Sequence, residues 1–235
     1  MTGPANTFLM ECADIFGNPR KMILKLVFTL LLGLPFILAN MPGTVSIAGI
    51  GFLILFSSFF GASVGMVRKK TAGLIIRLSL LPVPSIVWLS DFALAGAVMD
   101  FFQTGTILAL YLLVHGQGIT VGAIMLTVTL FAVTVLILNI LGIMLGQWLS
   151  SNAEVHLTGA FTTLILAFVS GLVPVPERLR IVQGAAAQYN PLNMLLKVLS
   201  GCTEGGTHVS GIHIVWSLTV IAILATVIAY RWRKH

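Results

Sequence analysis

Long apolar stretches, separated by short polar breaks, dominate the chain. Each stretch is close to the ~20 residues that a helix needs to cross a bilayer, and the breaks contain Pro, Gly or charged residues. The expected spans cover residues 22–40, 45–67, 92–114, 119–148, 157–173 and 212–230. The pattern therefore predicts an all-α membrane protein with six transmembrane helices in one domain, residues 1–235.

The segment before the first span, residues 1–20, has a different pattern. Apolar residues recur there at helical spacing, whereas polar residues occupy another face: Phe8, Cys12, Ile15 and Phe16 against Glu11, Asp14 and Asn18. This predicts an N-terminal helix that lies in the cytoplasmic interface of the membrane. A frayed N-terminus is the alternative.

A second amphipathic segment follows the fifth span, in residues 174–200. Its apolar residues share one side and its two arginines lie elsewhere: Leu179, Val182 and Ala186 against Arg178 and Arg180. We expect this segment to dip back toward the membrane as re-entrant helices rather than project into water.

The composition supports a membrane protein. The chain is 57% hydrophobic and 9% charged, with a mean hydropathy of +1.04, whereas a soluble domain carries about 25% charged residues. Six spans leave no room for a soluble catalytic domain. The net charge of +6 would suit a nucleic acid, but cytoplasmic loops of membrane proteins collect Lys and Arg, so we expect no nucleic-acid partner.

The distribution of cations predicts the orientation. With both termini in the cytoplasm, ten of the 13 Lys and Arg residues lie inside, and the remaining three are Arg178, Arg180 and Lys197. The reverse orientation would break the positive-inside tendency. We expect a multi-pass protein of the cell (cytoplasmic) membrane.

Residues 68–85, between the second and third spans, carry four cations: Arg68, Lys69, Lys70 and Arg77. Cations are costly in hydrocarbon, at roughly 2.5 to 3.5 kcal/mol each at the bilayer centre, so this segment lies at the membrane face. On one helix, Lys70, Gly73 and Arg77 would share a face. The pattern predicts a basic helix that docks on a partner protein, and the alternative is a basic loop held by anionic lipid headgroups.

Two motif regions resemble the ABC-2 type permeases, the membrane subunits of type V exporters in the ATP-binding cassette superfamily. The first is Thr71-x-Gly73, then Arg77-Leu78 and Leu81-Pro82-x-Pro84-Ser85; the second is Ser170-Gly171-x-x-Pro174-x-Pro176, then Asn190-Pro191. The six-span plan and the N-terminal helix extend the resemblance over nearly the whole chain. The family often has an acidic residue near the first motif, whereas this stretch is wholly basic.

The resemblance implies a transport subunit that works with a separate cytoplasmic ATPase and a second permease protomer, identical or related. ATP and Mg²⁺ would bind to the ATPase, and this chain would bind no cofactor. The cargo would be a hydrophobic or amphiphilic small molecule, or a peptide. The implied ATPase-coupling residues are Arg68, Lys69, Lys70, Thr71, Gly73, Arg77 and Leu78, and the implied re-entrant or gate residues are Ser170, Gly171, Pro174, Pro176, Asn190 and Pro191.

Several motifs of enzymatic chemistry are missing from the sequence. It has no G-x-x-x-x-G-K-[ST] phosphate loop, no H-E-x-x-H and no C-x-x-C. We therefore expect a transport subunit rather than an enzyme. Two alternatives remain open: a membrane-embedded enzyme or metal-handling assembly factor, and a channel or transporter that is independent of ATP.

Asp100 is the one carboxylate well inside an expected span, and an intramembrane acid is a functional hypothesis by default. It could bind a cationic substrate or carry a proton, or it could be a structural residue bonded to Gln103, Thr104 or Asn139. With Asp100, the candidate pathway residues are Asn139, Phe59 and Phe60. Cys202, His208 and His213 are weak metal candidates, because their spacing matches no recognised site, and we expect no metal.

Overall fold

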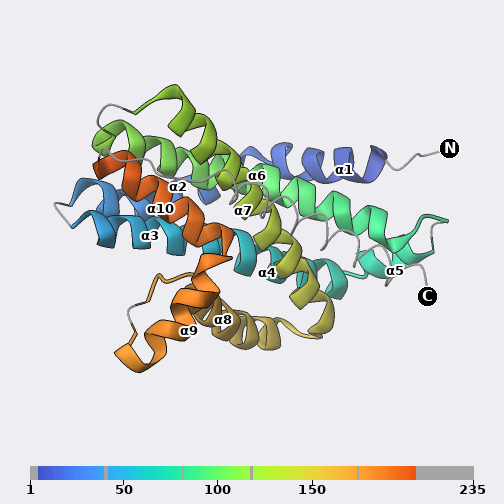
Figure 1. Cartoon of the computed structure of the whole chain (residues 1–235). Helices are drawn as coiled ribbons and strands as arrows, with labels where there is room; N and C mark the ends of the chain where they lie inside the picture. Colours follow the sequence, from blue (N-terminus) through green and yellow to red (C-terminus); the bar gives the residue numbers. More distant parts are fainter. Residues whose placement is uncertain (1–4, 40–41, 81, 117–118, 174, 205–235) are drawn as a thin grey trace.

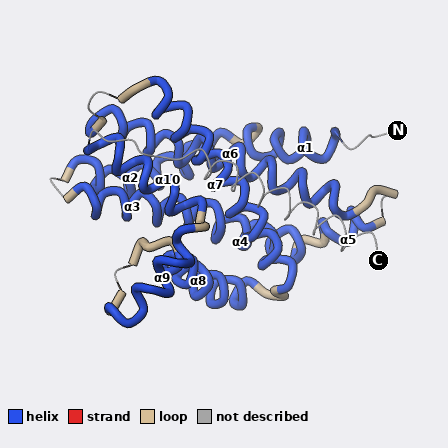
Figure 2. The backbone as a smooth tube through the Cα atoms, viewed as in Figure 1, coloured by secondary structure: helices blue, strands red, loops and turns tan. Residues whose placement is uncertain are grey.

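The computed structural model describes residues 5–39, 42–80, 82–116, 119–173 and 175–204, and every regular element within them is a helix (Figures 1 and 2). The all-helical prediction is therefore confirmed for this part of the chain. In chain order the elements are α1 (Ala5–Phe16), α2 (Pro19–Leu38), α3 (Gly43–Leu55), the π-helix η1 (Phe56–Phe60), α4 (Gly61–Thr71), α5 (Leu74–Ser79), α6 (Ser85–His115), α7 (Val121–Trp148), α8 (Asn152–Val169), α9 (Glu177–Gln188) and α10 (Pro191–Glu204).

Four helical stretches are long and apolar enough to cross a membrane: Gly43–Thr71, Ser85–His115, Val121–Trp148 and Asn152–Val169. They indicate a membrane-embedded protein and match the second to fifth expected spans. The first expected span corresponds to a shorter apolar helix, Met22–Leu38. The sixth, residues 212–230, lies outside the described residues, so it stays a prediction.

Side-chain contacts to helix ends show which ends lie together. Lys70, in the last turn of α4, donates from Nζ to the carbonyl oxygens of Gln147 (2.9 Å) and Leu149 (3.0 Å) at the end of α7. A ring nitrogen of His115, at the end of α6, lies 2.9 Å from the carbonyl oxygen of Ile37 in α2. The α4–α5 and α7–α8 connections accordingly lie toward one end of the bundle, and the α2–α3 and α6–α7 connections toward the other (Figure 1).

The helix boundaries correct two expectations. The third span begins at Ser85 rather than at residue 92, because Pro84 occupies the N-cap position and the helix runs continuously from there. The fifth span begins at Asn152 rather than at residue 157. Ser151 caps that helix, and Glu154 completes a capping box, which satisfies backbone N–H groups that the first turn leaves unpaired.

The end of α8 shows why the chain turns there. Gly171 adopts φ +76°, a left-handed conformation that favours glycine. The amides of Gly171 and Leu172 donate to the carbonyls of Phe168 and Ala167, the pattern of a Schellman motif. The chain then runs through α9, on the surface of the bundle, to α10.

α10 returns into the protein and packs against α3 and α7. Its side chains Leu192, Leu195 and Leu199 are fully buried in the main hydrophobic core. Cys202, one turn further, is buried in the same core, which gives it a packing role. The apolar side of α10 is thus part of the same hydrophobic core as the long apolar helices.

α1 lies against α6 and α2, and Glu11 of its expected polar face points into the bundle rather than into water. Glu11 is only 7% exposed and forms an ion pair with Lys69 of α4, whereas Leu9 and Met10 are exposed. Asp91 of α6 also interacts with Thr7 and with the backbone of Phe8. Polar contacts therefore attach α1 to the bundle, whereas Leu9, Met10 and Phe16 are exposed.

Candidate functional site

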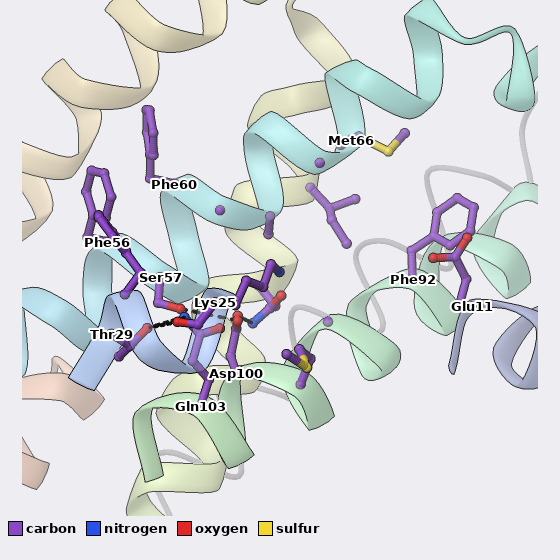
Figure 3. Close-up of a pocket in the computed structure, with 18 of the residues that line it drawn as sticks. Glu11, Lys25, Thr29, Phe56, Ser57, Phe60, Met66, Phe92, Asp100 and Gln103 are labelled. Carbon is purple, nitrogen blue, oxygen red and sulfur yellow. Dashed lines mark hydrogen bonds between the residues drawn. The ribbon is translucent and has the colours of Figure 1, made fainter. Parts of the chain in front are cut away.

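A pocket of about 350 Å³ lies among the helices, with walls from α1, α2, α6, α7 and the continuous stretch α3–η1–α4 (Figure 3). Asp100, Gln103, Thr29 and Lys25 lie together in one part of it, and Glu11 and Phe92 lie in another. The pocket therefore joins a polar cluster within the spans to the basic end of α4.

The π-helix η1 shapes one wall of the pocket. A π-helix inside an α-helical span shifts the register of the side chains and is frequent at functional sites. Here Phe56, Ser57 and Phe60 of η1 all line the pocket. The rings of Phe56 and Phe60 stack with centroids 4.8 Å apart.

Asp100 is the centre of the polar cluster and is only 6% exposed. Its Oδ2 accepts a hydrogen bond from Nδ2 of Asn139 on α7 (2.9 Å), and its Oδ1 accepts one from the Ser57 hydroxyl (3.3 Å). The Ser58 hydroxyl lies near the same carboxylate without meeting hydrogen-bond geometry. An ionised carboxylate has about four acceptor positions, so two neutral donors leave capacity for a further partner.

Gln103, one turn along α6, links the cluster to α2. Its side-chain nitrogen donates to the hydroxyl of Thr29 and, at 3.4 Å, to the carbonyl oxygen of Lys25. Its side-chain oxygen has no hydrogen-bond partner among the described residues, although Gln103 is only 8% exposed. An unpaired buried acceptor is unfavourable, so this oxygen is suited to receive a donor from a ligand.

The Lys25 side chain lines the same pocket and is exposed. Its ammonium interacts electrostatically with Asp100, but the two groups form no ion pair in the described part of the chain. Lys25 thus balances the buried acid from a distance.

The other part of the pocket lies where α1, α4 and α6 meet. Lys69 pairs with Glu11, and its ammonium lies 4.0 Å from the centroid of the Phe92 ring, a cation–π contact. Asp14 of α1 also lines this part. One lysine thus ties three helices together beside the pocket.

Exposed apolar residues form one side of the pocket. Phe28 and Leu32 of α2 and Phe56 and Gly61 of η1–α4 are all exposed and line it. The pocket therefore opens sideways, between α2 and η1–α4. In a membrane-embedded bundle, this opening can admit the apolar part of a molecule.

The expected coupling segment differs from its prediction. Lys70, Gly73 and Arg77 do not share one helical face, because α4 ends at Thr71 and Gly73 adopts φ +72°, which separates α4 from α5. Lys69 and Lys70 turn toward the bundle, where they bind Glu11 and the end of α7. The basic side chains left exposed here are Arg68 and Arg77.

Helix α5 has a buried side and an exposed side. Leu78 is buried in a cluster with Met66, Trp88 and Phe92, and Leu74 and Ile75 pack against that cluster. Leu78 is therefore a packing residue in this structure, and its implied part in ATPase coupling stays a prediction. Ile76 and Leu80, at 68% and 81% exposure, lie on the outward side with Arg77.

The expected re-entrant or gate residues gather where α8, α9 and α10 meet. Nδ2 of Asn190 donates to the Ser170 hydroxyl (2.8 Å), and Oδ1 of Asn190 accepts from the Leu192 amide (2.9 Å) at the start of α10, after Pro191. Gly171 forms the turn, and Pro176 is the N-cap of α9. Pro174 lies outside the described residues. In the structure these residues cap helices and join them.

The other candidate residues are divided between the pocket and the core. Asn139 and Phe60 line the pocket with Asp100, whereas Phe59 is buried in the hydrophobic core and does not. Among the described residues, no three His, Cys, Asp or Glu side chains group as metal ligands. His208 and His213 lie outside the described residues.

Thr29, Ser57 and Gln103 belong to the site but were not predicted from the sequence. Each is a polar residue inside an apolar span, which is a usable signal, since such residues tend to face a bundle interior or a cavity. What the sequence does not show is that three different helices, α2, η1 and α6, bring these side chains to one pocket. No protein-family model, curated protein or solved structure matches the chain.

Proposed function

We propose that this chain is the membrane-spanning permease subunit of an ATP-binding cassette exporter, driven by a separate cytoplasmic ATPase. The observation that carries the proposal is helix α5. Its apolar side is fixed to α4 and α6, and it presents Ile76, Arg77 and Leu80 outward. The chain has no nucleotide-binding motif of its own, so energy has to enter through a contact of this kind.

The connections of α5 support a coupling mechanism. α5 joins α4 through the Gly73 turn and joins α6 through residues 80–84, and both neighbours line the pocket. When ATP closes the ATPase pair, a force on α5 acts on these two spans together. The π-helix η1 interrupts the regular α-helix beside Asp100, so α3 and α4 can change their relative angle there.

The proposed assembly contains two permease protomers and two ATPase subunits, with both termini of this chain in the cytoplasm. ATP and Mg²⁺ bind to the ATPase, and the pocket receives an apolar or amphiphilic cargo. Affinity purification of the tagged chain from its native membrane tests the proposal. A protein with a Walker A motif should co-purify and should hydrolyse ATP, and its repeated absence under mild detergent would contradict the exporter function.

The orientation can be tested with two single cysteines in a Cys12→Ser, Cys202→Ala background. Asn152→Cys lies at the exposed start of α8, and Gly184→Cys lies on α9, where a Cβ meets open space. We expect an impermeant thiol reagent to label position 184 in whole cells and to label position 152 only after the cells are opened. The opposite labelling would reverse the proposed orientation.

A transporter that is independent of ATP is the second candidate function. The polar cluster of Asp100, Asn139 and Ser57 favours it, since intramembrane acids also serve in ion and proton pathways. The purified chain separates the two functions once it is reconstituted into proteoliposomes. An ATP-independent transporter should move its substrate there without any ATPase, whereas an exporter subunit should not.

A further inference from the structure

The pocket concentrates negative charge in a chain whose net charge is +6. Three of the seven acidic residues line it, namely Glu11, Asp14 and Asp100, against two lysines, Lys25 and Lys69. Glu11 and Lys69 neutralise each other as an ion pair. Asp14 is exposed in that same part of the pocket, so the part around Asp100 holds one acid, Asp100, and one base, Lys25. When Lys25 moves away, one negative charge is left there, which favours a monovalent cation as ligand.

The part of the pocket around Asp100 and Gln103 has hydrogen-bond acceptor positions without donors. This observation is independent of the charge. Asp100 has only neutral donors in hydrogen-bond contact, and the side-chain oxygen of Gln103 has no partner among the described residues. Both residues are more than nine-tenths buried. A ligand that donates hydrogen bonds and carries a positive charge would satisfy both.

Lys25 is placed so that it can give way to such a ligand. Its ammonium makes no ion pair with Asp100, and its side chain is exposed. The long lysine side chain can therefore extend toward the membrane surface when another cation approaches. Its backbone carbonyl, which accepts bonds from Thr29 and Gln103, can keep its place.

The remaining walls suit an apolar body. Phe56 and Phe60 stack beside Ser57, and Met66 and Met99 contribute polarisable side chains. Aromatic faces attract organic cations, and methionine adapts to irregular shapes. The sideways opening past Phe28 allows entry from the bilayer.

We propose that this pocket binds an amphiphilic organic monocation, with its ammonium group against Asp100 and the Gln103 oxygen, and its apolar body between α2 and η1–α4. As a description of cargo, this rests on the transport function proposed above. Binding itself does not, because it needs only this chain.

The test uses the full-length chain in nanodiscs and dansylcadaverine, a fluorescent primary amine with an aromatic body. We expect saturable binding with a blue-shifted emission, beyond the signal from empty nanodiscs.

Asp100→Asn should weaken binding at least about tenfold, since hydrogen bonds to charged groups are among the strongest. Lys25→Met should strengthen binding roughly threefold, because it removes the competing cation. The N-acetylated, neutral form of the probe should bind at least about tenfold more weakly.

Glu177→Gln is the matched control, since it removes a charge from an exposed position on α9 outside the pocket, and it should leave binding unchanged. Equal binding of the charged and the neutral probe would overturn the proposal, and so would weaker or unchanged binding in Lys25→Met. The lysine variant keeps the test valid even where Asp100→Asn fails to fold. If the chain binds the probe but no ATPase co-purifies, the binding proposal stands and the exporter function is rejected. If an ATPase co-purifies but the chain does not bind the probe, the exporter function stands and the binding proposal is rejected.

Discussion

Replacing Gly142 with alanine is expected to destabilise the protein by about 1–3 kcal/mol, the usual range for overpacking in a tight core. Gly142 lies on α7 where it meets η1 and α4. A Cβ there would collide with the carbonyl oxygen of Phe59 and lie 2.9 Å from the Cβ of Ala62. Backbone atoms cannot move aside as a flexible side chain can, so the helices would have to separate. Thermal unfolding of purified protein in detergent measures the effect.

Gly122→Ala is the control for this prediction, because Gly122 lies on the same helix and a Cβ there meets nothing within 4 Å. Alanine favours helix by up to about 1 kcal/mol over glycine, so this variant should keep or raise the unfolding temperature. Gly146→Ala should behave like Gly142→Ala, since its Cβ would lie 2.6 Å from the carbonyl oxygen of Ser63. Equal unfolding temperatures for Gly122→Ala and Gly142→Ala would show that close glycine packing does not hold these helices together.

This helix contact was readable in part from the sequence. Gly142 and Gly146 form a G-x-x-x-G motif, which lets membrane helices approach closely. The partner helix could not be predicted, because a glycine pattern does not say which helix packs against it. The structure places the backbone of Phe59 and Ser63 there.

The four long apolar helices were predictable, because the length of an apolar stretch is the sequence signal for a helix that can cross a bilayer. The ends of these helices were less predictable, because local capping residues decide where a helix begins and ends. Ser151 and Glu154 form a capping box whose S-x-x-E spacing is visible in the sequence, yet hydropathy alone began the fifth span at residue 157. For α6, the N-cap residue Pro84 marks a start that hydropathy placed seven residues too late.

The candidate site was predicted only at its centre. Asp100 and its partner Asn139 stood out because polar residues are rare inside spans. The rest depends on tertiary contacts that no local pattern reveals. Glu11 was placed on an outward polar face, but it turns inward because Lys69 is within reach to neutralise it. Helical periodicity also gave a wrong prediction for Lys70, Gly73 and Arg77, which were expected to share one face of a helix. The left-handed conformation of Gly73 separates α4 from α5, so the three residues do not lie on one helix.

The largest functional effect is expected at α5. Arg77→Glu, combined with Leu80→Asp, should abolish co-purification of the ATPase or reduce it at least about tenfold. Both side chains lie on the outward side of α5, so they are free to meet a partner. Reversing a charge at such a contact introduces repulsion, and a new carboxylate adds a desolvation cost. A quantitative blot of the ATPase recovered with the tagged chain measures the loss.

Gly73 does not offer a clean test of the same contact. Any side chain at its left-handed conformation is strained, so a bulky residue would disturb the α4–α5 turn with or without a partner.

The matched control for the α5 variant is Arg180→Glu, the same charge reversal at an exposed position on α9. It should leave ATPase recovery unchanged, because in the proposed orientation α9 lies on the opposite side of the membrane. If the α5 variant inserts normally and retains its ATPase as well as Arg180→Glu does, then α5 does not receive the energy of ATP hydrolysis. The exporter proposal would then lose the observation that carries it, whereas the pocket around Asp100 would keep its own evidence.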